Sequence, residues 1–187
     1  QREFNSLVSI VNDSVVIIGY PRLEKESLFN SAAVIQDGKV IYNHDKVLLP
    51  TYDVFDEKRY FSSSNEIKNV EITIDGKPVS IGVQICEDLW DSDYELKVAD
   101  KMIAEGAELI VNISASPYRK KILDKRLSLC EDKSIHLKYY FIYCNMVGAQ
   151  DELIFDGRSF VIDNKGKLKA LGGHCESALV DFDSSED

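Results

Sequence analysis

The sequence predicts one α/β domain in which a mixed β-sheet is covered by helices. Two observations support this fold class. Asp37-Gly38 and Asp75-Gly76 each separate two apolar runs, which is the strongest short-range signal for an antiparallel hairpin. After Cys86 the chain alternates between helical and strand patterns, which is typical of parallel strands joined by helices. Both kinds of strand pairing are therefore expected, and 187 residues are about the length of one domain.

Composition and charge narrow the possible partners. The 44% of hydrophobic residues can fill a sizeable core, and the net charge of −10 disfavours nucleic acid and anionic membranes as partners. No apolar run approaches the ~20 residues of a membrane span, and the first residues lack a signal-peptide layout. The four cysteines show no spacing typical of a zinc site or a disulfide framework. We therefore expect a cytoplasmic protein without a metal site.

The first 61 residues are expected to form a helix, three strands and a long loop. Apolar positions 4, 7, 8 and 11 share one helical face, with no capping residue before them. The run 15–20 predicts a strand covered on both faces, and 28–36 with 39–44 forms the first hairpin. The loop 46–61 is irregular, aromatic and charged, and long ordered loops of this kind are usually functional.

The second half of the chain begins with a hairpin of 70–74 and 79–85, in which Lys77 and Pro78 lengthen the turn. Residues 92–95 have the form of a capping box, and the helix after them presents positions 96, 99, 103 and 107 on one face and ends near Gly106. The remaining predicted elements are a strand at 108–115, a helix from 122 to 130, a strand at 138–147 and short strands at 159–162, 168–171 and 178–182.

Three of the predicted strands end in residues that can carry chemistry. Lys46 follows one strand, Cys86 follows another, and the small polar residues 112–116 end a third. Ligands bind at the carboxyl edge of such sheets, so an amine, a thiol and hydroxyl groups could share one site. A lone cysteine is otherwise more often a small buried hydrophobe, and a lone lysine is usually a solvated loop residue.

Four segments together carry a resemblance to a known family. They are KVLLPTYDVFDEKRYF at 46–61, GVQICEDLW at 82–90, NISASPY at 112–118 and VGAQDELIFDGRSFV at 147–161. In this order and spacing they resemble the nitrilase superfamily of carbon–nitrogen hydrolases, and specifically the amidohydrolase (glutaminase) domain of glutamine-dependent NAD synthetases. The resemblance runs across nearly the whole chain. It implies a four-layer α-β-β-α sandwich and a Glu-Lys-Cys triad.

Carried over by position, the resemblance makes Cys86 the nucleophile and Lys46 the triad lysine. A lysine charge can stabilise both a thiolate and an oxyanion, and the backbone N–H of Glu87 can supply a second donor. Attack on the side-chain amide of glutamine then releases ammonia and leaves a thioester, which water hydrolyses to glutamate.

The resemblance also assigns residues to glutamine binding. They are Tyr52, Phe55, Glu57, Glu87, Ser114, Ser116 and Arg119. The ammonium group of glutamine requires a carboxylate, for which Glu57 and Glu87 are candidates, and its carboxylate requires hydroxyls or a guanidinium. Glu57 can alternatively assist as a second carboxylate near the lysine, and Lys120 or Lys121 can replace Arg119.

The sequence departs from the family pattern at its start. No Phe-Pro-Glu-like segment supplies the triad glutamate, so we expect residues 1–187 to be a partial, N-terminally incomplete glutaminase domain that lacks the first strand and the start of the first helix. No Ser-Gly-Gly-x-Asp segment of an ATP-using synthetase domain is present either. We expect no cofactor in this domain, whereas ATP and magnesium are implied for a synthetase domain or subunit that would be its partner. A homo-oligomer is also expected, and the chain by itself should be inactive.

Two alternatives remain open at this point. One is a stand-alone nitrilase-type amidase that acts on another amide, and the other is a non-catalytic scaffold in which Cys86 is inert. The loop residues YDVFDEKRYF at 52–61 favour glutamine over another amide.

Overall fold

The fold is known from a computed structural model, which describes residues 2–183. Its helices are α1 (Arg2–Ile10), α2 (Val98–Ala104) and α3 (Ile122–Ser134), with short 3-10 turns η1 (Glu57–Arg59), η2 (Cys86–Leu89) and η3 (Asp91–Asp93). Its strands are β1 (Val15–Glu24), β2 (Ser27–Gln36), β3 (Lys39–Asp45), β4 (Val70–Ile74), β5 (Lys77–Ile85), β6 (Leu109–Ser114), β7 (Tyr140–Asn145), β8 (Val147–Gln150), β9 (Leu153–Asp156), β10 (Phe160–Asp163) and β11 (Leu168–Leu171).

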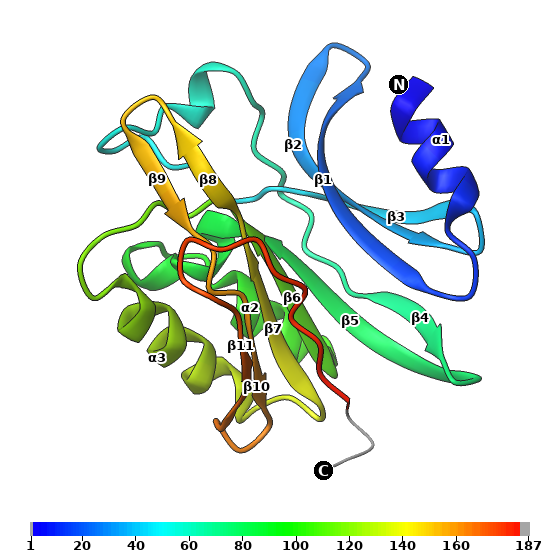
Figure 1. Cartoon of the computed structure of the whole chain (residues 1–187). Coiled ribbons are helices and arrows are strands. Elements are labelled where there is room, and N and C mark those ends of the chain that lie inside the picture. Colours follow the sequence, from blue (N-terminus) through cyan, green and yellow to red (C-terminus); the bar gives the residue numbers. More distant parts are fainter. Residues whose placement is uncertain (1, 184–187) are drawn as a thin grey trace.

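The described strands form two packed sheets and one separate hairpin (Figure 1). The small sheet has the order β1-β2-β3, the large sheet has the order β11-β10-β7-β6-β5-β4, and β8 pairs with β9. In the large sheet, β5, β6 and β7 are parallel, whereas β4 and β10 pair antiparallel with their neighbours. The predicted mixed sheet is therefore confirmed. Parallel pairing brings the ends of β5 and β6 to one edge, which is where Cys86 and Ser114 lie.

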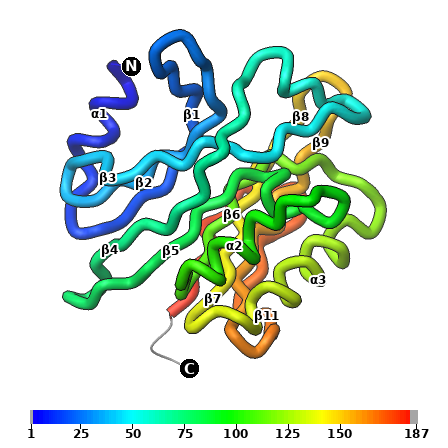
Figure 2. The backbone as a smooth tube through the Cα atoms, turned by 180° about the vertical axis from the view of Figure 1, so that it is seen from behind, coloured from blue at the N-terminus to red at the C-terminus, as the bar shows by residue number. Residues whose placement is uncertain are grey.

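Three hydrophobic clusters separate four layers of secondary structure. One joins α1 to the outer face of the small sheet through residues such as Val11 and Ala33. A second lies between the two sheets, where Ala32 meets Val83. The third packs α2 and α3 against the far face of the large sheet, and Figure 2 shows these helices from that side. This α-β-β-α order is the sandwich that the resemblance implied.

Local turn chemistry explains the best-predicted elements. Both Asp-Gly pairs are two-residue turns, with Gly38 and Gly76 at φ values of 69° and 72° that glycine adopts without strain. The prediction that Lys77 and Pro78 lengthen the second turn is wrong, because both residues pair within β5. Pro78 is tolerated there because β6 pairs with β5 only from Ile81 onward, so β5 has β4 as its one neighbour at that point.

Other predictions are corrected by tertiary contacts. The capping box at 92–95 is wrong, since α2 begins at Val98 and the Lys97 ammonium donates to the carbonyls of Asp91 and Ser92 instead. Residues 178–182 form no strand, and the hairpins β1–β2 and β8–β9 were not predicted as such. Cys144 lies within the predicted strand 138–147 but is exposed, because the cluster between the sheets includes no residue of β7.

Among residues 2–183, no helix is long and apolar enough to cross a membrane.

Candidate active site

Cys86 occupies the turn at the end of β5. The strand stops there because the chain enters η2 with a φ of 45° at Cys86, a left-handed conformation that non-glycine residues adopt rarely. Burial raises the pKa of the thiol, and the Lys46 charge opposes this effect without cancelling it. A base is therefore needed to remove the thiol proton at neutral pH.

Lys46 lies at the end of β3 and is almost completely buried, with 1% of its side chain exposed. Its Nζ donates to Glu57 Oε1 at 2.6 Å, and Glu57 Oε2 accepts a longer hydrogen bond of 3.4 Å from Asn30 Nδ2. The backbone is also held, since Lys46 N–H donates to the Asn30 carbonyl at 2.8 Å. Burying an ammonium group is costly unless it is paired, so Glu57 is the partner that makes this placement stable.

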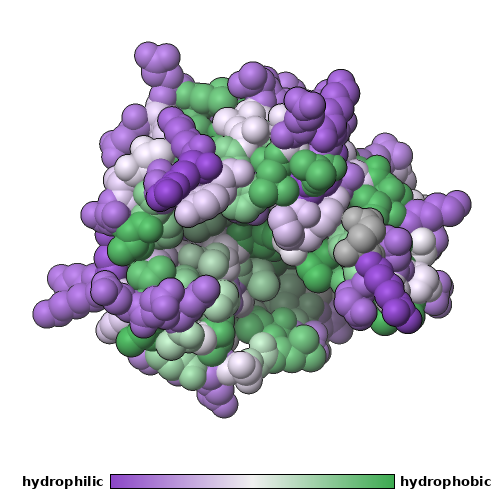
Figure 3. Space-filling view, turned by 90° about the horizontal axis from the view of Figure 1, so that it is seen from above, coloured by the Kyte–Doolittle hydropathy of each residue, from purple (hydrophilic) through white to green (hydrophobic). Residues whose placement is uncertain are grey.

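One cavity of about 390 Å³ brings the predicted strand ends together. It is lined by Gly19, Asn30, Lys46, Phe55, Glu57, Ile85, Cys86, Ile113, Ser114, Ala115 and Met146. Figure 3 looks down on the molecule and shows a central hollow with hydrophobic walls. The expectation that an amine, a thiol and a hydroxyl meet at one edge is confirmed, because Lys46, Cys86 and Ser114 all line this cavity.

Glu87 follows the thiol and is held by two tyrosines. It is buried, and its carboxylate accepts hydrogen bonds from the hydroxyls of Tyr52 at 2.9 Å and Tyr94 at 3.0 Å. Burial and the bond to Glu87 together raise the pKa of Tyr94 to about 12. Tyr94 was not singled out by sequence, although it follows Glu87 by seven positions and lies in a segment that reads as a helix start. The pair of donors fixes a buried negative charge beside Cys86.

The polar residues after β6 have different surroundings. Ser114 lines the cavity and donates to Asn112 Oδ1 at 2.6 Å. Ser116 does not line it, and the Ser116 hydroxyl accepts from the buried Arg126 guanidinium at 3.2 Å. Arg119 lies outside the lining as well and is exposed, 3.7 Å from Asp53. The structure thus brings Ser114 to the cavity, whereas Ser116, Arg119, Tyr52 and Glu87 lie outside its lining.

Side chains around η2 fix the shape of the turn that carries Cys86. Gln84 Nε2 donates to the Asp88 carbonyl at 3.1 Å, and Asn112 Nδ2 donates to the Cys86 carbonyl at 3.5 Å. The Asp88 carboxylate accepts the backbone N–H of Ile85 at 3.0 Å. Sequence reasoning missed these supports, although Asp88 lies within the CEDLW segment.

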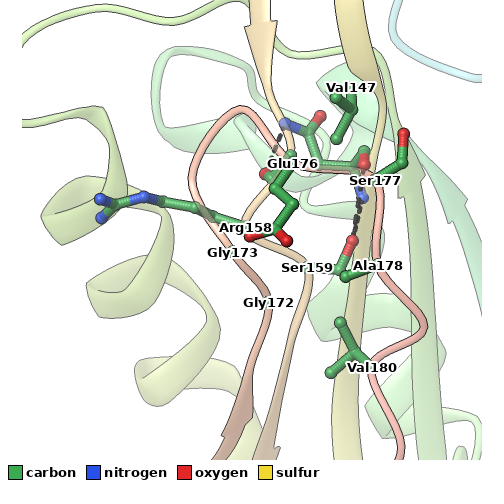
Figure 4. A pocket seen from close by; sticks show the side chains of 11 residues that line it. Val147, Arg158, Ser159, Gly172, Gly173, Glu176, Ser177, Ala178 and Val180 are labelled. Carbon is green, nitrogen blue, oxygen red and sulfur yellow. Dashed lines mark hydrogen bonds between the residues drawn. The ribbon is translucent and has the colours of Figure 1, made fainter.

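A second cavity, of about 210 Å³, lies between Val147, Ser159 and the segment from Gly172 to Val180 (Figure 4). It contains none of the predicted site residues. The Asn145 side-chain amide and the Ser159 hydroxyl on its wall are already used in hydrogen bonds to the backbone, and the Arg158 side chain extends away from it. The Asn145 and Ser159 side chains therefore support the local backbone.

Comparison with known proteins identifies the family. A family model described as carbon–nitrogen hydrolase matches residues 9–185. The chain belongs to the carbon–nitrogen hydrolase family. Two relatives of this carbon–nitrogen hydrolase are glutamine-dependent NAD(+) synthetases, one from Aquifex aeolicus with 42% identity over 168 residues and one from Thermotoga maritima with 39% identity over 158 residues. The alignments cover 90% and 84% of this chain but 28% and 26% of the relatives, so the chain spans roughly a quarter to a third of their length.

Solved structures support the same assignment. The glutamine-dependent NAD+ synthetase from Acinetobacter baumannii, determined in complex with ADP, matches this carbon–nitrogen hydrolase with a TM-score of 0.79 and 29% identity over 95% of this chain and 32% of that chain. A carbon–nitrogen hydrolase from Helicobacter pylori matches with the same TM-score at 22% identity, covering 95% of this chain and 63% of that chain. The second likeness concerns the fold alone, and together they confirm the nitrilase-type sandwich.

Proposed function

We propose that this chain is the glutaminase portion of a glutamine-dependent NAD synthetase. It hydrolyses the side-chain amide of glutamine, and the ammonia serves an ATP-dependent synthetase domain that converts deamido-NAD to NAD. The observation that carries the proposal is the placement of Lys46 and Cys86 in one cavity, with Glu57 bonded to the lysine. The names of the relatives support glutamine as the substrate.

The first half of the reaction forms a thioester. The Cys86 thiol gives up its proton, and Sγ forms a bond to the amide carbon while the C=O electron pair moves to oxygen. Lys46 and the backbone N–H of Glu87 stabilise that oxyanion. When the carbonyl reforms, the C–N bond breaks, and the nitrogen leaves as ammonia after receiving a proton.

The second half of the reaction hydrolyses the thioester and regenerates the free enzyme. Water attacks the thioester, the C–S bond breaks, and glutamate leaves with the Cys86 thiol restored. Both halves need a proton carrier. The resemblance implies a triad glutamate for which this sequence shows no matching segment, and Glu57 is the carboxylate that contacts Lys46 among the described residues. We assign Glu57 to orienting the Lys46 ammonium group. It is also our candidate for the group that accepts the thiol proton and passes it on to the leaving nitrogen.

Recognition of glutamine rests on charges that flank the cavity. Glu87, with Tyr52 bonded to it, offers a fixed carboxylate to the ammonium group of the substrate. Phe55 and Ser114 line the cavity itself, so we assign them to contacts with the carbon chain and the polar ends of the substrate. All of these assignments stay predictions, and Tyr52, Glu87, Ser116 and Arg119 lie outside the lining of the cavity.

The test compares ammonia release from glutamine by the full-length gene product and its Cys86→Ala variant. We expect the variant to lose glutamine hydrolysis and glutamine-dependent NAD formation but to keep NAD formation from free ammonia. A Cys175→Ala variant is the matched control, since Cys175 is exposed and lies outside the cavity lining. Undiminished hydrolysis by Cys86→Ala would overturn the proposal. A higher kcat/KM for a simple aliphatic amide than for glutamine would favour a stand-alone amidase.

A further inference from the structure

The geometry points to Asp88 and His44 as a positioning pair that fixes Lys46 relative to Cys86. This inference rests on the proposed function, because it concerns the same site. Neither residue lines the cavity, so both act through the two residues that do.

The Asp88 carboxylate is completely buried and accepts four hydrogen bonds. Oδ1 accepts the backbone N–H groups of Val47 at 3.1 Å and Leu48 at 2.9 Å. Oδ2 accepts the backbone N–H of Ile85 at 3.0 Å and His44 Nε2–H at 3.0 Å. A buried carboxylate with four donors is well satisfied, whereas the loss of its charge would leave several donors unpaired.

The backbone donors to Asp88 come from the segment that carries Lys46 and from the segment that carries Cys86. Val47 and Leu48 directly follow Lys46, and Ile85 directly precedes Cys86. The two segments belong to different sheets, and no described strand ladder joins β3 to β5. One carboxylate therefore bridges a gap that backbone pairing does not cross.

His44 fixes the orientation of this carboxylate. It is the penultimate residue of β3, has no exposed surface and pairs with Ala32 in the small sheet. Because the Asp88 carboxylate only accepts, Nε2 of the imidazole carries the proton. The other ring nitrogen, Nδ1, is buried without a hydrogen-bond partner among the described residues. A buried nitrogen without a hydrogen-bond partner lowers the stability of the fold. The presence of His44 at this position is explained if its bond to Asp88 is needed.

The test uses three variants in the full-length protein: Asp88→Asn, His44→Leu and the conservative His44→Gln, whose side-chain amide can donate to Asp88. The main readout is the pH profile of Cys86 alkylation by iodoacetamide, followed by peptide mapping without glutamine. The groups that interact with the thiol are Lys46, Glu57, Glu87, Tyr52, Tyr143 and Ser114, and all of them remain in these variants.

We expect the profiles of Asp88→Asn and His44→Leu to move to higher pH by roughly one unit, because Lys46 no longer stays close enough to favour the thiolate. We also expect kcat for glutamine to fall about 10- to 100-fold with KM within about threefold, and His44→Gln to restore most of both. Unfolding midpoints are measured in parallel, with Ala33→Leu as a destabilised control outside the site.

An unchanged alkylation profile in folded but destabilised His44→Leu would mean that the pair is merely structural and would overturn the inference. If Asp88→Asn does not fold, the two His44 variants decide the question. The alkylation profile is measured without substrate, so it tests the positioning pair separately from the proposed function. If the natural protein does not turn over glutamine, the proposed function is overturned, and the alkylation profile still decides whether the pair positions Lys46.

Discussion

At the scale of single residues, the central fact is a buried lysine beside a thiol whose pKa is raised. Lys46 opposes the effect of burial on Cys86 but does not cancel it. Burial thus disfavours the thiolate, and the lysine contributes most when negative charge develops on sulfur or on the carbonyl oxygen.

Replacing Lys46 with methionine should abolish most turnover while the fold is retained. Methionine fills a similar volume without charge, so the reaction loses its oxyanion donor. We expect kcat for glutamine to fall by at least ~10² to 10³. Ammonia release measures this effect, and Lys58→Met, an exposed residue of the same loop, is the matched control. Near-normal hydrolysis by Lys46→Met would remove the lysine from the mechanism.

Two alkylating reagents should label different sets of the four cysteines. A glutamine-analogue electrophile should label Cys86 first, because only this thiol lines the cavity. Small neutral iodoacetamide should also reach Cys144 and Cys175, which are exposed, whereas Cys130 should react slowly because burial raises its pKa well above normal. Peptide mapping measures both patterns. Labelling by the analogue mainly at Cys144 or Cys175 would contradict the assignment of Cys86.

At the scale of elements, α3 shows how a helix can bury a charge. Its buried face includes Arg126 between Ile122 and Cys130, with the guanidinium donating to Asp156 Oδ1 at 2.9 Å and to the Ser116 carbonyl at 2.8 Å. The arginine thus ties α3 to the end of β9 and to the segment after β6. Ser116 directly follows Ala115, which lines the cavity, so this connection reaches the edge of the candidate site.

Arg126→Met should destabilise the protein by about 3–5 kcal/mol, since Asp156 would keep a buried charge without its partner. Urea unfolding of the variant measures the change in the free energy of unfolding. The double variant Arg126→Met with Asp156→Asn should recover part of the loss, because no uncompensated charge remains. A double variant as unstable as the sum of the two single ones would show that the residues do not interact.

Elements governed by local chemistry could be predicted from the sequence, and those governed by distant contacts could not. The Asp-Gly turns needed nothing beyond their own residues, whereas the turn between β1 and β2 places Lys25 at a φ of 56° and gives no glycine signal. Arg126 was hidden because a charged residue on an apolar stripe reads as an interruption. Cys86 and Lys46 were found through motifs, but the bond from His44 to Asp88 joins residues 44 positions apart.

At the scale of the whole molecule, the relative position of the two sheets sets the geometry of the site. Lys46 directly follows a strand of the small sheet and Cys86 directly follows a strand of the large one. The hydrophobic cluster between the sheets, which includes Ala32 and Val83, therefore also determines how the reacting groups meet.

Two neighbouring alanines of β2 test this dependence. Both are fully buried, but Ala32 faces the large sheet and Ala33 faces α1. Either change to leucine should cost about 1–3 kcal/mol of stability by overpacking. Only Ala32→Leu should also lower glutamine turnover at a temperature where both variants are folded, because it pushes the sheets apart. Equal activity of the two variants would show that the sheet spacing does not control the site.

The split of the site between two sheets also has a consequence for refolding. The hairpin that leads to Lys46 joins strands adjacent in sequence, whereas the large sheet requires parallel pairing of β5 with β6 across the intervening helix α2. Contacts between residues close in sequence form sooner than distant ones. During refolding the lysine segment should thus be in place before the nucleophile turn, and capture of Cys86 by a glutamine-analogue electrophile would time the last stage of assembly.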